Sequence, residues 1–169
     1  VLLPDVLVLD QELRERNYSF SHLVEAWNST KVGQVMVERV DSDTIEDYGV
    51  ADLDGAESKP FKSVALKGLV EKPSSEEAPS NLAVLGRYIL PSKVLGLLEN
   101  TKAGVGGEIQ LTDALDELLK TDGLNSFETD AGIHDCGNKQ GFLSANLAVG
   151  MRDPETREEI KRLFERSDW

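Results

Sequence analysis

Apolar and polar residues follow one another along the chain with two different spacings. Residues 20–31 repeat apolar side chains every three or four positions, which is the spacing of an amphipathic helix. Residues 33–40 instead alternate valines, unevenly, with polar positions, as a strand does. The same two spacings predict the remaining elements: strands within residues 1–5, 47–55, 61–72, 81–90, 125–130 and 132–137, and helices within residues 91–100, 108–121, 139–151 and 153–167.

The first three elements are a strand, a helix and a strand, which is the order of a crossover unit. We expect residues 1–5 and 33–40 to be parallel neighbours in one sheet, joined by a right-handed crossover through the helix at 20–31. The last helix is expected to begin with Asp153 as its N-cap and Pro154 just inside its first turn. The pattern therefore predicts an α/β fold with a mixed sheet and a helical C-terminus.

The charge of the chain narrows the classes of ligand. The 169 residues are 40% apolar and 29% charged, which is an ordinary balance for one globular domain. The formal net charge of -13 argues against a nucleic-acid partner, because a phosphate backbone is held mainly by clustered Lys and Arg. An acidic chain can still bind a nucleotide if a metal ion and one or two cations offset the repulsion. The alternative is that the charge only keeps the protein in solution.

Cysteine usage and the start of the chain favour a cytoplasmic protein without a membrane segment. Cys136 is the single cysteine, so no disulfide forms within the chain, and with only His22 and His134 beside it a Cys/His zinc site is not expected. No apolar run approaches the length that crosses a bilayer, and Asp5 and Asp10 interrupt the opening segment where a signal peptide would be apolar.

The first residues also suggest an incomplete sequence. The chain has no initiator Met and begins with "VLLPD", which reads as a buried strand running straight to an acid. We therefore expect a fragment or one half of a cleaved protein.

Two acids follow apolar segments and are candidate metal ligands. Ligands gather outside the carboxyl ends of strands in open α/β sheets, and Mg²⁺ prefers one or two carboxylates together with phosphate oxygens and water. Asp5 and Asp135 are placed to provide such a site. The alternatives are that Asp5 caps a turn and that Asp135 forms an Asx turn leading into the helix at Lys139. His134 is expected to be a packed or surface histidine.

A glycine-rich stretch at residues 104–113 resembles a phosphate-binding loop only superficially. It lacks the lysine and the spacing of a P-loop, and Glu108 in the first helical turn would repel an anion. A flexible loop that leads into a helix is the stronger interpretation.

Glu71, Lys72 and Pro73 stand where an apolar strand gives way to a polar loop. A glutamate can accept hydrogen bonds from two vicinal sugar hydroxyls, and a lysine can supply a charge to a phosphate. Neighbouring residues of a strand point to opposite faces, so both can touch one ligand only if the backbone bends here. The alternative is an ordinary surface ion pair.

Six motifs taken in order resemble those of the bacterial UTP-glucose-1-phosphate uridylyltransferases, also called UDP-glucose pyrophosphorylases. They are "LLPD", "DYGV", "GLVEKP", "APSNLAVLGRYIL", "GGEIQLTDAL" and "HDCGNKQGF", and the resemblance runs from Leu2 to about Met151. "VEKP" recurs in the wider sugar-nucleotidyltransferase superfamily, whereas "EIQLTDA" with "HDCGNK" is more specific. The resemblance implies a Rossmann-like mixed sheet, here incomplete, and a homodimer or homotetramer.

The resemblance also implies a reaction and a division of the chain. The family uses Mg²⁺ to make UDP-glucose and pyrophosphate from UTP and glucose 1-phosphate. Residues 1–151 would be the sugar-phosphate- and metal-binding part of the nucleotidyltransferase domain, and residues 152–169 a C-terminal helix. The alternatives are a nucleotidyltransferase for another nucleotide or sugar, and a regulatory or interaction domain of the same fold without activity.

Matching motifs carry the family's sugar-binding roles to four residues. Gly49 matches a glycine whose backbone lies against the glucose ring, and Glu71 matches the residue that binds glucose hydroxyls. Lys72 matches the residue that contacts the sugar-linked phosphate and is the main catalytic candidate. Asn81 lies in a segment that lines the sugar pocket.

The family's metal-binding roles fall on the two acids. Asp5 matches the catalytic acid that holds Mg²⁺ on the phosphates, and Asp135 matches a second metal ligand. The family's opening glycine-rich nucleotide loop and the segments that read uracil do not occur in the 169 residues. We therefore expect activity to require that N-terminal part.

Overall fold

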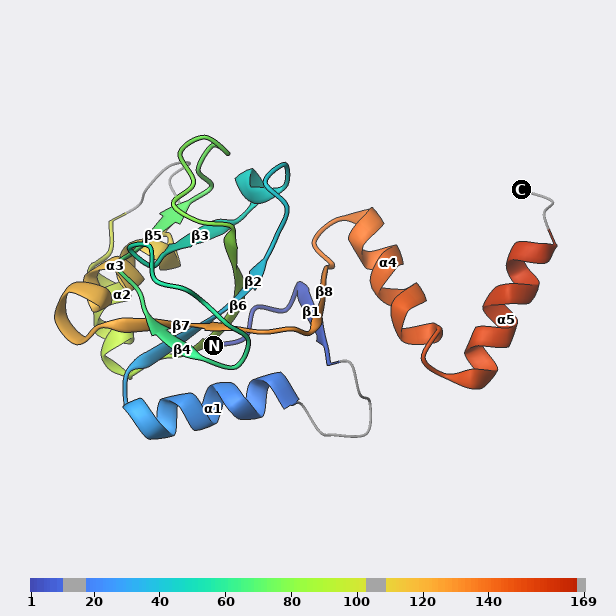
Figure 1. The fold of residues 1–169 in the computed structure, drawn as a ribbon, viewed down its shortest axis with the longest axis horizontal. Helices are drawn as coiled ribbons and strands as arrows, with labels where there is room; N and C mark the ends of the chain where they lie inside the picture. The colour runs from blue at the N-terminus through green and yellow to red at the C-terminus, as the bar shows by residue number, and fades with distance from the viewer. Residues whose placement is uncertain (11–17, 103–108, 167–169) are drawn as a thin grey trace. The chain divides into compact units, whose positions relative to one another are not determined.

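The computed structural model describes residues 1–10, 18–102 and 109–166 (Figure 1). The chain divides into two compact units. The first contains Val1–Leu2 and the described part of Glu12–Asp130, and the second contains the described parts of Leu3–Gln11 and Ala131–Trp169.

A six-stranded mixed sheet forms the centre of the first unit. Its order is β4-β7-β2-β6-β3-β5. Within the sheet, β7 runs parallel to β2, and the other neighbouring pairs are antiparallel. The strands are β2 (Gly33–Arg39), β3 (Gly49–Asp52), β4 (Ser63–Ala65), β5 (Gly68–Glu71), β6 (Leu82–Ile89) and β7 (Leu124–Glu128). The expected mixed α/β sheet is therefore confirmed.

The core of this unit is built around β2. Val35, Met36 and Val37 are consecutive, so they point to alternate faces of the sheet, and all three are at most 1% exposed. One face packs against α2 (Lys93–Asn100) and α3 (Leu111–Asp122), whose buried side chains join the same apolar cluster as Val35 and Val37. Helix α1 (Tyr18–Thr30) also contacts β2, and a short 3-10 helix, η1 (Ile45–Asp47), precedes β3.

The second unit contains a two-stranded sheet and two helices. Strand β1 (Val6–Leu9) pairs antiparallel with β8 (Gly132–Asp135), and α4 (Lys139–Gly150) and α5 (Pro154–Glu165) follow. As predicted, α5 begins with Asp153 as N-cap, because its carboxylate accepts a hydrogen bond from the backbone N–H of Thr156, and Pro154 lies in the first turn. None of the helices in the described part of the chain is long and apolar enough to span a bilayer.

The predicted crossover at the start of the chain is wrong. Val1 and Leu2 are more than half exposed, and Leu2 makes only an isolated antiparallel bridge to Arg87. The chain turns at Pro4 and Asp5, so the strand begins after the acid and pairs with β8. The physical reason is that proline cannot donate to a strand ladder, and both edges of β2 are already taken by β6 and β7.

Glu38 on β2 generates a prediction about pH. Burial raises the pKa of its carboxyl from 4.5 to about 7, so the folded chain holds this proton over a range in which the unfolded chain loses it. The resulting stability is lost as the pH rises through about 7. Because the carboxyl is only partly buried and solvent screens it, Glu38→Gln, which mimics the protonated form, should remove a loss on the order of 1 kcal/mol between pH 5 and pH 8.

Urea unfolding at both pH values measures this difference. Glu99→Gln, at an exposed position on α2, is the matched control and should keep the wild-type pH profile. Equal pH profiles for wild type and Glu38→Gln would contradict the raised pKa of the Glu38 carboxyl.

Candidate functional site

The structure places the six candidate residues in two groups, one in each unit. The first unit holds the four sugar-binding candidates and the second holds the two metal-binding candidates. The first group is Gly49, Glu71, Lys72 and Asn81, and the second is Asp5 and Asp135.

Gly49 and Glu71 face each other across the antiparallel pair β3 and β5. A Cβ atom on Gly49 would lie 3.2 Å from Oε2 of Glu71 and 3.8 Å from Cβ of Val84 on β6. A side chain at position 49 would therefore crowd the carboxylate. Without a side chain at position 49, the half-buried backbone lies directly beside Glu71 and Val84, and the sequence had not indicated Val84.

Thr112 holds the carboxylate of Glu71 from a third element. Its hydroxyl donates a hydrogen bond to Oε2 of Glu71 over 2.9 Å, from the first turn of α3. This bond restricts the rotamer of Glu71 and leaves the other oxygen, Oε1, for further donors. Sequence reasoning missed Thr112, because 41 residues separate it from Glu71 and "QLTD" by itself gives no sign of what its hydroxyl contacts.

The negative charge of Glu71 also affects the pKa of a buried tyrosine. Tyr88 on β6 is 6% exposed. Burial, with a smaller contribution from the negative charge of Glu71, raises the pKa of the Tyr88 hydroxyl to about 12. The hydroxyl therefore keeps its proton at neutral pH.

The backbone turns at Lys72, immediately after β5 ends. Lys72 has a φ of 46°, in the left-handed region, and its N–H donates to the carbonyl oxygen of Tyr48 over 3.1 Å. The bend that a shared ligand requires is therefore present. Glu71 and Lys72 are both exposed, and no ion pair joins them or involves the Lys72 ammonium within the described residues. The ammonium is thus available to an anion.

Asn81 lies in a different environment from Glu71. Its side-chain oxygen accepts a hydrogen bond from Nη1 of Arg39 over 3.0 Å. The same guanidinium binds both carboxylate oxygens of Glu128, which is 5% exposed, over 3.2 Å each. Charge-assisted, two-point bonds of this kind fix the plane of the guanidinium. Asn81 is therefore tied to the Arg39–Glu128 pair, and the residue of its segment that borders Gly49 is Val84.

Asp5 and Asp135 come together although 129 residues lie between them. The pairing of β1 with β8 sets Val6 opposite Asp135, and the N–H of Cys136 donates to the carbonyl oxygen of Asp5 over 2.6 Å. Both carboxylates border Gly137: a Cβ atom there would lie 3.0 Å from Oδ1 of Asp135 and 3.7 Å from Oδ2 of Asp5.

The carboxylate of Asp135 is held by the turn that leads into α4. It accepts hydrogen bonds from the N–H of Gly137 over 2.8 Å and from the side-chain amide of Asn138 over 3.0 Å. The Asx turn that the sequence offered as an alternative is therefore present. Each carboxylate oxygen has two lone pairs, so these bonds leave acceptor capacity on both oxygens.

The donor set suits a hard cation that brings other ligands with it. Groups of three or more His, Cys, Asp or Glu side chains that could hold a metal are absent from the part of the chain that the structure describes. Two carboxylates beside a backbone without a side chain fit Mg²⁺, which normally completes its shell with water and phosphate oxygens. They do not fit zinc, which prefers nitrogen and sulfur ligands.

Two further sequence interpretations have simple outcomes. His134 is half-buried on β8 with its Nδ1 3.3 Å from the hydroxyl of Ser144, so it is a packed histidine, as expected. The glycine-rich residues at 104–107, for which we expected a flexible loop, lie outside the described residues, together with Glu108.

Comparison with known families finds a match to the part of the chain that contains both groups. The sequence model described as nucleotidyl transferase matches residues 4–151. The chain belongs to the nucleotidyl transferase family. This match contains both carboxylates, the β3–β5 pair and the start of α4.

Individual nucleotidyl transferases show the same relationship and confirm the resemblance that the motifs indicated. The UTP–glucose-1-phosphate uridylyltransferase of Haemophilus influenzae is 39% identical over 161 residues, which are 95% of this chain and 55% of that protein. The enzyme of the same name from Escherichia coli K12 is also 39% identical, over 98% of this chain and 54% of its own length. The chain thus spans about half the length of the curated relatives it matches.

Solved structures of nucleotidyl transferases share the fold as well. A UTP-bound UGPase from Acinetobacter baumannii superposes with a TM-score of 0.86 at 40% identity, covering 99% of this chain and 56% of that one. A UDP-glucose pyrophosphorylase complexed with UDP-glucose gives a TM-score of 0.79 at 31% identity, covering 90% and 56%. The sheet and helices described above are therefore those of the nucleotidyltransferase fold.

The close approach of α4 to the backbone of Asp135 generates a stability prediction. A Cβ atom on Gly141, in the first turn of α4, would lie 1.7 Å from the carbonyl oxygen of Asp135. Gly141→Ala must therefore push α4 away from β8, and we expect it to destabilise the second unit by about 2–3 kcal/mol. Hydrogen exchange of the α4 amides measures this loss.

Gly96→Ala is the matched control, because a Cβ atom at Gly96 in α2 meets nothing within 4 Å. That change should stabilise the chain by about 0.5–1 kcal/mol. Unchanged exchange rates in α4 of Gly141→Ala would show that the close approach to Asp135 is wrong.

Proposed function

We propose that this chain provides the sugar-phosphate-binding and Mg²⁺-binding part of a UTP–glucose-1-phosphate uridylyltransferase. The observation that carries the proposal is the carboxylate of Glu71, which Thr112 holds beside the backbone of Gly49, followed by the exposed ammonium of Lys72, which forms no ion pair with another described residue. It occurs in a chain that is 39% identical to curated enzymes with that name.

The sugar end of the ligand would lie against β3 and β5. Gly49 leaves room for a hexose ring to approach the backbone, and Glu71 can accept hydrogen bonds from two neighbouring hydroxyls. Because Thr112 already donates to Oε2, the sugar hydroxyls would find the carboxylate oriented before they bind. We keep Asn81 as a member of the surrounding segment, positioned by Arg39.

The phosphate of glucose 1-phosphate would lie at the turn that follows β5. Lys72 is exposed there, and its charge would offset the anionic charge of the attacking phosphate. In the reaction, a phosphate oxygen of glucose 1-phosphate forms a bond to the α-phosphorus of UTP. The bond from that phosphorus to the bridging oxygen breaks, and the electron pair leaves with pyrophosphate. Alignment and charge neutralisation are the work of the protein in such a transfer.

Asp5 and Asp135 would hold the metal ion on the phosphates. When bound, Mg²⁺ neutralises phosphate charge and fixes the direction of attack. The residues' own part is to present two carboxylates at the turn between β8 and α4, where Gly137 and Asn138 already orient Asp135. No protein nucleophile is required by this scheme.

The rest of the enzyme is also part of the proposal. The relatives are nearly twice as long as this chain, and the motifs of a nucleotide-binding loop do not occur in the 169 residues. We propose that the site for UTP is contributed by sequence outside them, and that the enzyme works in the cytoplasm as a homodimer or homotetramer.

The proposal is tested by product formation. The chain alone, and the chain joined to the upstream part of the Haemophilus influenzae relative, are incubated with UTP, glucose 1-phosphate and Mg²⁺, and UDP-glucose and pyrophosphate are quantified. We expect equal amounts of the two products from the joined protein, and neither when Mg²⁺ is chelated. Faster product formation with dTTP or with galactose 1-phosphate would contradict the proposed substrates, and no product with any pair would contradict the activity.

Lys72→Ala tests the phosphate contact. Loss of one charged contact should weaken glucose 1-phosphate binding by roughly 10–100-fold and lower turnover severely, while the free energy of unfolding changes by less than about 0.5 kcal/mol. Titration calorimetry and urea unfolding give the two quantities. Lys59→Ala, at another exposed lysine, is the control and should bind normally. Wild-type binding and turnover in Lys72→Ala would refute its role.

Glu71→Gln tests the sugar contact. The amide keeps the shape of the side chain but loses the charged acceptor, so the KM for glucose 1-phosphate should rise by about tenfold while the KM for UTP stays constant. Steady-state kinetics on the joined protein separate the two constants. A rise in both constants, or in neither, would argue against a role confined to the hexose.

A further inference from the structure

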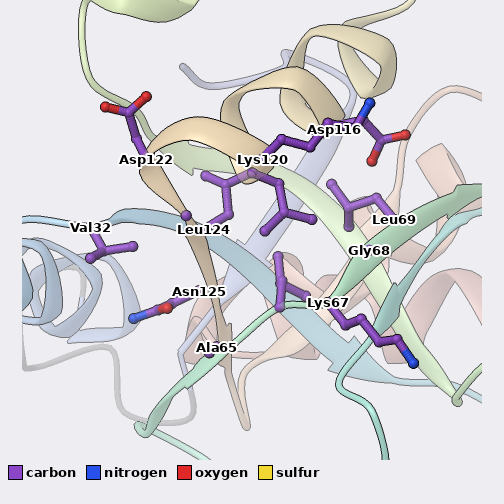
Figure 2. Close-up of a pocket in the computed structure, with 13 residues that line it drawn as sticks. Val32, Ala65, Lys67, Gly68, Leu69, Asp116, Lys120, Asp122, Leu124 and Asn125 are labelled. Atoms are coloured by element: carbon purple, nitrogen blue, oxygen red, sulfur yellow. The ribbon is translucent and has the colours of Figure 1, made fainter.

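The first unit contains a pocket that none of the candidate residues lines. It has a volume of about 590 Å³ and lies between the C-terminal half of α3, the segment from β4 into β5, and the start of β7 (Figure 2). Glu71 and Thr112 belong to the same two elements, β5 and α3, but neither is among the lining residues. The pocket is therefore separate from the proposed sugar site.

The floor of the pocket is apolar. Leu66 and Leu69 are 7% exposed, Leu124 is 1% exposed, and the half-buried side chain of Leu119 completes the surface. Sites for small organic ligands typically have volumes of about 300–1,000 Å³ and mainly apolar walls, whereas one water molecule needs only about 30 Å³. The floor is thus suited to a ring or a short alkyl group rather than to a fully polar ligand.

The rim of the pocket carries an acid, Asp116, for which no hydrogen bond to a basic side chain is present among the described residues. Asp116 on α3 accepts a hydrogen bond from the backbone N–H of Leu69, and Figure 2 shows it at the edge of the pocket above that leucine. Burial raises the pKa of its carboxyl, an effect that the nearby positive charge of Lys120 partly offsets and that the negative charges of Asp113 and Glu117 slightly increase. An additional positive charge beside this half-buried carboxylate would favour its ionised form.

The lysines around the pocket do not supply that charge in full, because each is paired with another acid. Lys67 binds Asp54 over 2.5 Å, Lys120 binds Glu117 over 2.7 Å, and Lys93 binds Asp122. The charged residues that line the pocket are balanced, with Asp116 and Asp122 against Lys67 and Lys120. Among the charged residues that interact with these four, acids outnumber lysines: Asp52, Asp54, Asp113 and Glu117, against Lys93. The local field consequently favours cations over anions.

We propose that this pocket binds a small organic cation whose apolar body lies on the leucine floor and whose ammonium group lies beside Asp116. A carboxylate of the same shape would meet the same floor but would face the surplus of acids. A neutral analogue would gain the apolar contacts alone. The three chemistries therefore separate the contribution of the floor from that of Asp116.

The test uses benzylamine, benzyl alcohol and benzoate as probes of one shape and three charges. Each is titrated at pH 7.5 and constant ionic strength into the ¹⁵N-labelled 169-residue chain, and backbone amide shifts are followed. We expect benzylamine to shift the amides of residues 65–69 and 119–125 with a dissociation constant in the millimolar range, which is usual for so small a ligand. Benzyl alcohol should bind about tenfold more weakly and benzoate more weakly still.

Two variants decide whether Asp116 is the recognising group. Asp116→Asn keeps an oxygen for the Leu69 N–H but loses the charge, so it should bind benzylamine only as weakly as benzyl alcohol. Asp113→Asn removes an acid from the same helix that does not line the pocket, and it should change the affinity less than twofold. Dispersed amide spectra of both variants verify that they fold.

Several results would overturn the proposal. They are shifts outside the pocket, equal affinity for benzylamine and benzoate, saturation by none of the probes, or an equal loss of affinity in the two variants. None of these outcomes depends on UTP, glucose 1-phosphate or turnover, so they test the pocket independently of the proposed enzymatic function.

Discussion

Burial of β2 on both faces is the constraint on which the first unit depends. Three consecutive side chains, Val35, Met36 and Val37, are almost completely removed from water, and a strand buried in this way needs neighbours on both edges. Strands β7 and β6 fill those edges, and β3 and β5 follow on the side of β6. The register of that outer pair sets Gly49 opposite Glu71. The proposed sugar contact therefore depends on the strand order that pairs both edges of β2.

Close approaches at glycines shape the candidate sites in both units. Gly49 leaves room beside the carboxylate of Glu71, Gly137 lies between Asp5 and Asp135, and Gly141 lets α4 begin directly on the carbonyl of Asp135. In each place a polar group that would otherwise meet a side chain is left facing backbone or open space. Sites for sugar and phosphate groups require oriented polar groups and a backbone that the ligand can approach. In both units the carboxylates are oriented by N–H or O–H donors and lie beside such a backbone. This common feature links two candidate groups that lie in different units.

The sequence predicted the positions of the helices and strands better than it predicted which of them pair or contact each other. Strand and helix spacings are local, so the segments that became β2, β3, β6, β7, β8 and α1 to α5 were found, as was the N-cap at Asp153. The single strand predicted within residues 61–72 is wrong, because the segment forms two strands, β4 and β5, at opposite edges of the sheet. The backbone N–H of Leu66 still bonds to β7, whereas that of Lys67 bonds to Asp52 of β3. The pairing of the first strand was missed, because the choice between β2 and β8 depends on which edges are free in the folded sheet. The contact of Thr112 with Glu71 could not be read either, since it joins the first turn of one element to the end of another. The resemblance to a family pointed to Asp5 and Asp135, whereas their common border at Gly137 is visible only in three dimensions.

The central claim is that this chain of the nucleotidyl transferase family binds the sugar phosphate at the end of β5. The most direct measurement is a titration of the ¹⁵N-labelled chain with glucose 1-phosphate in the presence of Mg²⁺, with inorganic phosphate as the reference ligand. The account predicts saturable amide shifts at Gly49, Glu71, Lys72 and Thr112 with the sugar phosphate, and shifts confined to the region of Lys72 with phosphate. Saturable binding whose shifts leave Gly49 and Glu71 unaffected, or no binding at all, would contradict it.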